Sequence, residues 1–248
     1  MKHPYHPSRE KRKYGLKEIF RILGDRYWLM GYPDKKPRIW HWDFLCNDKK
    51  GVEKTILMFL KGKNLKVLDV GGGVSKYRKL FSEMGHKYTS LDVEEGADIK
   101  GDAEKMPIPE NSFDFVICMQ VLEHVRHPQK VVDEIHRVLK KGGKVFLTAP
   151  GIWALHPCPE DNWRFMPGGF KLLFEKFRNV KVSNNSGSSF CFAQNFNIYL
   201  GHIYKRAFFI LKPLVILLII LTNLAGMALK GISRSEHYVI NYTVTAEK

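Results

Sequence analysis

A chain of 248 residues with 44% hydrophobic and 26% charged residues suits one α/β domain with a sizeable core. Its formal net charge of +15 predicts an anionic partner, which is a nucleic acid, a membrane surface or a phosphorylated substrate. The four cysteines lie far apart without paired spacing, which excludes a disulfide framework and a zinc site, so we expect no metal and a reducing cytosol.

Residues 1–64 are expected to form a basic tail followed by a helical lid segment. The tail leads into no apolar stretch, so no signal peptide is expected. Apolar residues recur at helical spacing from Leu16 to Leu23, and a second helix is expected around residues 52–60. The stretch between the two helices is rich in aromatic residues and includes Trp42.

Residues 65–77 read Leu-Lys-Val-Leu-Asp-Val-Gly-Gly-Gly-Val-Ser-Lys-Tyr, which predicts a strand, a tight loop and a helix. Gly71 and Gly73 permit positive φ and close approach of a ligand, and the helix start offers free N–H groups. We therefore expect a small polar ligand. The loop lacks the Gly-Lys-Ser or Gly-Lys-Thr ending of a P-loop, and Lys76 replaces the third glycine of a dinucleotide-binding fingerprint.

Strand and helix patterns alternate from this loop onward, with strands at 67–70, 87–91, 97–100, 113–119 and 144–149 and helices at 75–84 and 127–140. Such alternation predicts a mostly parallel sheet with right-handed crossovers. Ligands of these sheets bind at the carboxyl ends of the strands. Four polar residues are expected to converge there: Asp69, Asp92, Asp102 and Gln120.

Six short motifs follow one another along the chain: Asp69-Val-Gly-Gly-Gly, Leu91-Asp92, Gly101-Asp102-Ala103, Ser112-Phe-Asp-Phe-Val-Ile-Cys, Val121-Leu-Glu-His-Val and Leu139-Lys-Lys-Gly-Gly-Lys-Val. With these motifs the chain resembles class I S-adenosylmethionine-dependent methyltransferases, most closely the bacterial small-molecule and glycan-pathway branch. The resemblance covers residues 65–177 and implies a Rossmann-like seven-stranded sheet whose last strand is antiparallel. The family's third loop glycine is Ser75 here, which caps a helix start well.

S-adenosylmethionine is the cofactor that the resemblance implies. Asp92 is placed to accept both ribose hydroxyls, with a helix-capping role as the alternative. Asp102 and the backbone of Ala103 are placed to take the adenine amino group. The methionine end and the methyl group are expected to lie near Asp69, Gly71, Gly73 and Gln120.

Methyl transfer from a sulfonium is an in-line displacement, so positioning alone supplies up to about 7 to 11 kcal/mol and no protein nucleophile is needed. A hydroxyl acceptor would also need a base. The candidates are His124, His156 and Glu160. For His124 the alternative is a structural role, in which it and Glu123 form hydrogen bonds that fix the loop.

Two segments are implied to contact the acceptor. Trp42 belongs to an aromatic cluster that either forms a substrate lid or caps the edge of the sheet. Trp163 and Arg164 lie in a proline-rich loop after the fifth strand, ahead of a helix beginning near Pro167, and Arg164 either binds substrate or anchors that loop.

Residues 207–229 are an apolar insertion in the domain of residues 65–248, flanked by Lys205, Arg206 and Lys230. A single membrane crossing would separate the final strand, expected at 237–245, from its sheet. We therefore predict an in-plane or re-entrant membrane contact that favours anionic headgroups. The alternatives are a buried helix and a homodimer interface.

These observations favour a cytoplasmic, membrane-associated methyltransferase acting on a small, lipid-linked or membrane-proximal acceptor, such as a glycan precursor or a prenylated ring. Nucleic-acid methylation is an alternative, but Met119-Gln-Val-Leu stands where amino-methylating DNA enzymes carry a Pro-Pro-aromatic tetrapeptide. A second alternative is a non-catalytic membrane adaptor that retains the fold.

Overall fold

The computed structural model describes residues 56, 60, 62, 64–73, 77–155, 160–184, 187–229 and 237–248. The helix expected at 16–23, Trp42 and His156 lie outside these residues. Of the helix expected around 52–60, Ile56 is described as helical, and its side chain is completely buried.

Seven strands form one mixed sheet in the order β3-β2-β1-β4-β5-β7-β6. Strand β7 is antiparallel to both β5 and β6, and the other pairings are parallel. The predicted fold, with its antiparallel last strand, is therefore confirmed. The strands are β1 (Lys66–Val70), β2 (Lys87–Asp92), β3 (Ile99–Lys100), β4 (Phe113–Met119), β5 (Leu139–Pro150), β6 (Arg178–Asn184) and β7 (Asn241–Glu247).

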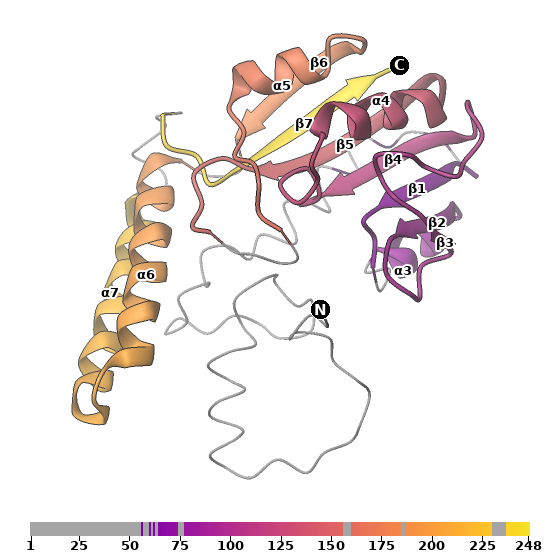
Figure 1. Ribbon diagram of the computed structural model, residues 1–248. Coiled ribbons are helices and arrows are strands. Elements are labelled where there is room, and N and C mark those ends of the chain that lie inside the picture. The colour runs from indigo at the N-terminus through magenta and orange to yellow at the C-terminus, as the bar shows by residue number, and fades with distance from the viewer. Residues whose placement is uncertain are drawn as a thin grey trace.

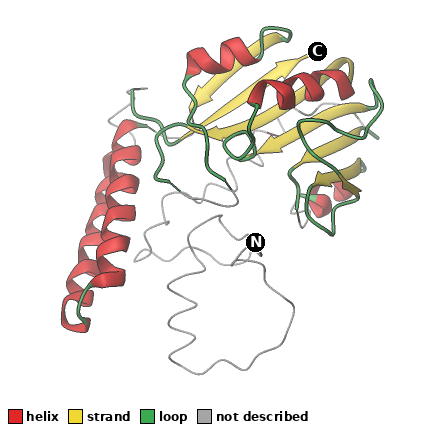
Figure 2. Cartoon of the chain, in the orientation of Figure 1, coloured by secondary structure: helices red, strands yellow, loops and turns green. Residues whose placement is uncertain are grey.

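Helices cover both faces of the sheet, as Figures 1 and 2 show. Helices α4 (Pro128–Val138) and α5 (Pro167–Leu173) pack on one face, where Ile135 and Phe170 join the main buried cluster. Helix α3 (Arg78–Glu83) packs on the other face through Phe81, together with Ile56. The strands between them bury apolar side chains on both sides, as parallel strands in such sheets do.

Several predicted boundaries need correction. Helix α3 spans Arg78–Glu83 rather than residues 75–84, and strand β3 begins at Ile99 rather than at residue 97. Strand β5 begins at Leu139 rather than at residue 144, because Phe113 pairs with Leu139 across an irregularity at the start of β4. The helix expected to reach residue 140 accordingly ends at Val138. The last strand begins at Asn241 and ends at Glu247, so the alternating pattern at 237–240 precedes the strand.

A two-helix hairpin is inserted between β6 and β7. It consists of α6 (Ser188–Arg206), the short 3-10 helix η2 (Phe209–Leu211) and α7 (Lys212–Leu229). Because β6 runs parallel to β1, β4 and β5, the hairpin begins at the carboxyl edge of the sheet. From there it extends away from the sheet (Figure 1). The sequence predicted the apolar helix before the last strand, but not its partner α6.

Candidate active site at the carboxyl edge of the sheet

The turn after β1 requires glycine for two physical reasons. Gly71 has φ +70°, and its N–H donates to the Leu91 carbonyl at 2.8 Å, so the turn is fixed against the end of β2. A Cβ atom at Gly71 would lie 2.4 Å from Cγ2 of Val121, in the loop after β4. The absence of a side chain therefore lets two strand-end loops meet at the centre of the sheet edge.

Asp92, the last residue of β2, faces this glycine turn. Its Oδ2 accepts a hydrogen bond from the Gly73 N–H at 2.9 Å, and its Oδ1 accepts one from the Glu94 N–H at 3.1 Å. Gly73 has φ +47°, a conformation that glycine adopts readily. A carboxylate is thus placed beside the turn after β1, where nucleotide-binding sheets hold a ribose.

Asp69 is nearly completely buried at the end of β1, with 3% of its surface exposed. It accepts a hydrogen bond from the hydroxyl of Tyr88 on the neighbouring strand β2. Sequence reasoning did not identify Tyr88, because a tyrosine in a strand is as often a packing residue as a hydrogen-bond donor. The contact fixes the orientation of the Asp69 carboxylate beneath the glycine turn.

Asp102 and Ala103 form a tight turn after β3. The exposed Asp102 accepts the Glu104 N–H at 2.8 Å through its side chain and the Lys105 N–H at 3.1 Å through its carbonyl. The Ala103 side chain is buried in the main core cluster.

Gln120 follows β4 with φ +56°, an uncommon conformation for a residue other than glycine. Its backbone N–H donates to the Thr148 carbonyl at 2.9 Å. Its side-chain amide donates to Thr148 Oγ1 at 3.2 Å and to Asn241 Oδ1 at 3.0 Å. Gln120 therefore connects the carboxyl ends of β4 and β5 to the start of β7.

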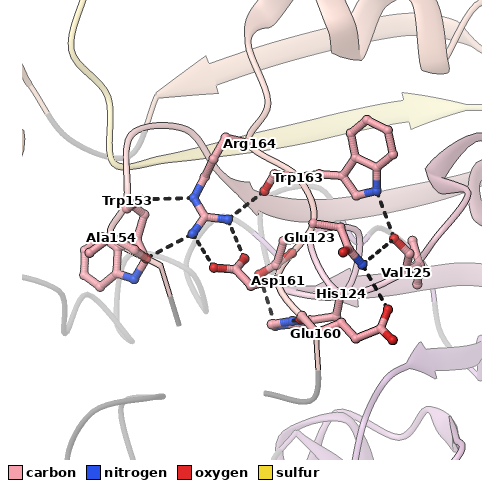
Figure 3. Close-up of polar contacts among 10 residues, drawn as sticks. Glu123, His124, Val125, Trp153, Ala154, Glu160, Asp161, Trp163 and Arg164 are labelled. Atoms are coloured by element: carbon pink, nitrogen blue, oxygen red, sulfur yellow. Dashed lines mark hydrogen bonds and ion pairs between the residues drawn. The ribbon is translucent and has the colours of Figure 1, made fainter. Parts of the chain in front are cut away.

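The loops after β4 and β5 are joined by a network of hydrogen bonds, shown in Figure 3. Trp163 donates its indole N–H to the Val125 carbonyl at 2.9 Å, and the Asn162 N–H donates to the Glu123 carbonyl at 2.7 Å. His124 bonds through Nδ1 to the Glu160 carbonyl at 2.5 Å. Because a carbonyl only accepts, Nδ1 carries the proton.

Glu123 is the most unusual titratable group at this edge. Its side chain is completely buried, and neither carboxylate oxygen has a hydrogen-bond partner among the described residues. Burial raises the pKa of Glu123 to about 8, although the nearby Arg164 acts in the opposite direction. Nε2 of His124 lies 3.8 Å from its Oε1. This contact with a buried carboxylate favours the structural alternative for His124.

Arg164 uses all five of its N–H groups within its own loop (Figure 3). Two donate to the Asp161 carboxylate at 2.5 and 2.6 Å, and the others donate to carbonyl oxygens of Trp153, Ala154 and Trp163 at 2.8 to 3.1 Å. Asp161 itself is only 1% exposed through its side chain. This geometry supports the loop-anchoring alternative for Arg164.

Glu160 lies at the outer end of the same loop. Hydrogen bonds from Asn162 and Arg126 lower the pKa of its carboxyl. Its Oε1 lies 3.4 Å from the Arg126 guanidinium, and its side chain is 47% exposed. At neutral pH it is therefore an ionised carboxylate at the rim of the site.

Comparisons with known proteins agree with this architecture. Residues 68–147 match a family model described as a methyltransferase domain. A chloroplastic 2-methyl-6-phytyl-1,4-hydroquinone methyltransferase of Spinacia oleracea is 29% identical over 142 residues, which cover 45% of this chain and 41% of that protein. A ubiquinone biosynthesis O-methyltransferase of Pseudomonas aeruginosa is 34% identical over 94 residues, which cover 37% of each protein.

The chain spans about two-fifths of the length of these curated relatives. Among solved structures, phosphoethanolamine N-methyltransferase 2 of Haemonchus contortus in complex with S-adenosyl-L-methionine has a TM-score of 0.55. Its sequence identity is 17%, and the match covers 85% of this chain and 56% of that one, which shows a shared fold. Residues 68–147 of the chain thus match a methyltransferase domain, and the chain shares the fold of that solved methyltransferase.

Proposed function

We propose that this chain transfers a methyl group from S-adenosylmethionine to a hydroxyl of a small acceptor that is lipid-linked or membrane-proximal. A prenylated ring is the favoured acceptor and a glycan precursor is the alternative. The proposal is supported by the methyltransferase domain and by two relatives whose names specify a phytyl hydroquinone and ubiquinone biosynthesis. The inserted apolar hairpin at the carboxyl edge supports the membrane-proximal part.

The observation that carries the cofactor assignment is the Asp92 carboxylate against the Gly73 N–H at 2.9 Å. In this proposal, Asp92 accepts the ribose hydroxyls. The backbone of Gly71 and Gly73 receives the methionine end together with Asp69, which Tyr88 orients. The turn at Asp102 and Ala103 takes the adenine, and Gln120 lies near the transferred group.

S-adenosylmethionine supplies an electrophilic methyl group, so the residues of this chain mainly have to orient the two reactants. The hydrogen bonds from the Trp163 indole and the Asn162 N–H hold the loop after β5 against the loop after β4, and those from Arg164 fix the loop after β5 internally. We propose that this pair of loops forms one wall of the acceptor site. Glu160 is an ionised carboxylate at its rim and is a candidate base, together with His156. His124 positions the loop through its bond to the Glu160 carbonyl.

The proposed location is the cytoplasmic face of a membrane. The helical stretch Phe209–Leu229, which comprises η2 and α7, is long and apolar enough to cross a bilayer. An 18-residue part of it has a mean hydropathy of 2.2, and only 22% of that part is buried inside the protein. A lipid-linked acceptor would then approach the carboxyl edge from the membrane plane.

The proposal is tested by incubating the full chain with methyl-labelled S-adenosylmethionine and one of three acceptors. These are a prenylated dihydroxybenzene in phospholipid vesicles, the same ring without its prenyl chain, and duplex DNA. We expect label in the organic extract of the first reaction. Label only on the free ring rejects the lipid-linked acceptor, and label only on DNA supports nucleic-acid methylation instead.

A further inference from the structure

The α6–α7 hairpin carries polar side chains between its helices and apolar side chains on its outer surface, the reverse of a helix pair in water. Along α7, the buried positions are Val215, Ile219, Asn223 and Gly226, which form one narrow stripe facing α6. The rest of this helix is apolar and largely open. A helix that is apolar on all faces normally requires a core or a lipid phase around it. Here one partner helix covers a single stripe.

Polar side chains lie in the seam between the two helices. The Asn197 amide donates to Oδ1 of Asn223 at 2.7 Å, and both side chains are completely buried. Ala193 and Gly201 lie one turn to either side of Asn197 on α6, and both are also buried. Small residues and an interhelical amide hydrogen bond are the features that join helices in membranes.

Large apolar side chains lie on the outside of the hairpin. On α7, Leu217, Leu221 and Leu224 are 50%, 53% and 47% exposed and lie outside the buried stripe. On α6 an exposed apolar stripe recurs at helical spacing through Phe192, Phe196, Tyr199 and Ile203. At the tip, Phe208, Phe209 and Ile210 are each more than 70% exposed.

An apolar groove runs between the two helices near the base of the hairpin. Its volume is about 500 Å³, and its lining includes Phe192, Phe196, Leu221, Ala225 and Leu229. Such a groove has the chemical character of a site for a hydrocarbon chain rather than for a polar peptide.

The charges around the hairpin have one sign. No aspartate or glutamate occurs between Glu175 and Glu236, whereas Lys205, Arg206 and Lys212 lie at the two sides of the apolar tip. These basic residues lie at the end of the hairpin away from the sheet, so on insertion they would reach the headgroup layer on the far side of the bilayer, where they are complementary to anionic lipids. Long basic side chains can also extend along apolar surface while their charged ends stay at the interface.

We infer that the α6–α7 hairpin inserts as a unit into an anionic phospholipid bilayer, with both of its ends on one side. Helices of 19 and 18 residues are roughly 27 to 29 Å long, close to the roughly 30 Å thickness of the hydrocarbon core. A hairpin leaves β6 and β7 on the same side, so insertion is compatible with an intact sheet. The inference deepens the membrane-proximal part of the proposed function and is independent of the chemical step.

The base of the hairpin is tied to the candidate active site. The Asn195 amide donates to the Ile152 carbonyl, in the loop after β5, at 3.4 Å. At the same end, Ser189 donates to the Leu229 carbonyl at 3.2 Å and Ser188 accepts the Tyr238 N–H at 3.3 Å. Insertion would therefore bring the acceptor loop to the bilayer surface.

The test is flotation of the purified full chain with vesicles of phosphatidylcholine alone or mixed with phosphatidylglycerol, followed by a wash in 1 M NaCl. We expect binding to the anionic vesicles that survives the salt wash. Changing Leu217, Leu221 and Leu224 together to Gln should lower the bound fraction at least about tenfold, because three half-exposed leucines lose their transfer into lipid. Changing Val93 and Leu172 to Gln, which alters exposed apolar residues outside the hairpin, should leave binding unchanged.

Three results would overturn the inference: equal flotation of the triple variant and the wild type, complete release by salt, or a lipid-free dimer held by the hairpin that binds no vesicles. Circular dichroism of the triple variant shows whether its helices persist. Failure of methyl transfer with intact vesicle binding would contradict the proposed function alone, so the two claims are tested separately.

Discussion

Glu123 holds a fully buried carboxyl group 3.8 Å from Nε2 of His124, in the loop that follows β4. The His124 ring is fixed from its other side by the Glu160 carbonyl. Because burial raises the pKa of Glu123 to about 8, this carboxyl is protonated in the folded chain at neutral pH. Glu123 and His124 thus link the buried end of β4 to Glu160 at the rim of the candidate site.

Glu123→Gln should change the pH dependence of stability. The ordinary pKa of the carboxyl is 4.5, so between about pH 5 and 8 the folded chain keeps a proton that the unfolded chain releases. The free energy of unfolding of the wild type should therefore fall as pH rises through this window and level off above it. Glu123→Gln should lack this component. Denaturant unfolding at pH 5.5 and 8.5 should show an extra loss of more than about 1 kcal/mol in the wild type. Equal losses in the two proteins would show that Glu123 titrates normally.

Gly71→Ala should destabilise the fold more than Gly96→Ala. Both glycines have positive φ, but a Cβ at Gly96 would contact nothing within 4 Å, whereas one at Gly71 would lie 2.4 Å from Val121. We expect a loss of about 1 kcal/mol for Gly96→Ala from backbone strain alone. For Gly71→Ala we expect about 1 to 3 kcal/mol more, from overpacking. Denaturant unfolding measures both losses, and Gly71→Ala combined with Val121→Ala should recover the difference. Equal losses in the two single variants would contradict the close approach of the loops.

Arg164→Ala should lower the free energy of unfolding by loosening the loop after β5. It leaves the nearly buried Asp161 carboxylate without its bidentate partner, a change that typically costs about 3 to 5 kcal/mol. Arg164→Ala combined with Asp161→Asn should be more stable than Arg164→Ala alone. Unfolding of the three proteins gives the coupling energy. If the single variant unfolds like the wild type but has a raised KM for the acceptor, Arg164 is a substrate ligand instead.

Most strands of the sheet could be predicted from the sequence because they are apolar runs that end at a glycine or an acidic or polar residue. Strand β6 was not located, because its sequence Arg-Asn-Val-Lys-Val-Ser-Asn is mostly polar. Asp69, Asp92 and the glycines at 71 and 73 each follow such a run, and Phe113–Met119 was predicted with its observed bounds. The strand starts at 139 and 241 were missed. Strand β5 begins within a Lys-Lys-Gly-Gly sequence that is typical of a helix end and loop, and only its pairing to β4 and β7 extends it.

Contacts between distant loops could not be predicted by periodicity. Tyr88 meets Asp69, and Arg164 meets the carbonyls of Trp153 and Ala154, through tertiary placement that leaves no local signal. Helix α6 was missed for a related reason. Its Gln, Asn and His residues dilute its apolar stripe, and its buried amides are explained only by the neighbouring α7.

The central claim is that a sulfonium nucleoside binds at the tips of β1 and β2, with Asp92 holding its ribose. Isothermal titration of the purified full chain with S-adenosylmethionine and with S-adenosylhomocysteine tests it most directly. Glu95→Ala is the matched control, because Glu95 lies three residues further along the same loop with a 94% exposed side chain. We predict that the wild type and Glu95→Ala bind both nucleosides and that Asp92→Ala loses affinity at least about tenfold, as loss of a charge-assisted hydrogen bond implies. No binding by the wild type, or equal binding by Asp92→Ala, would contradict the account.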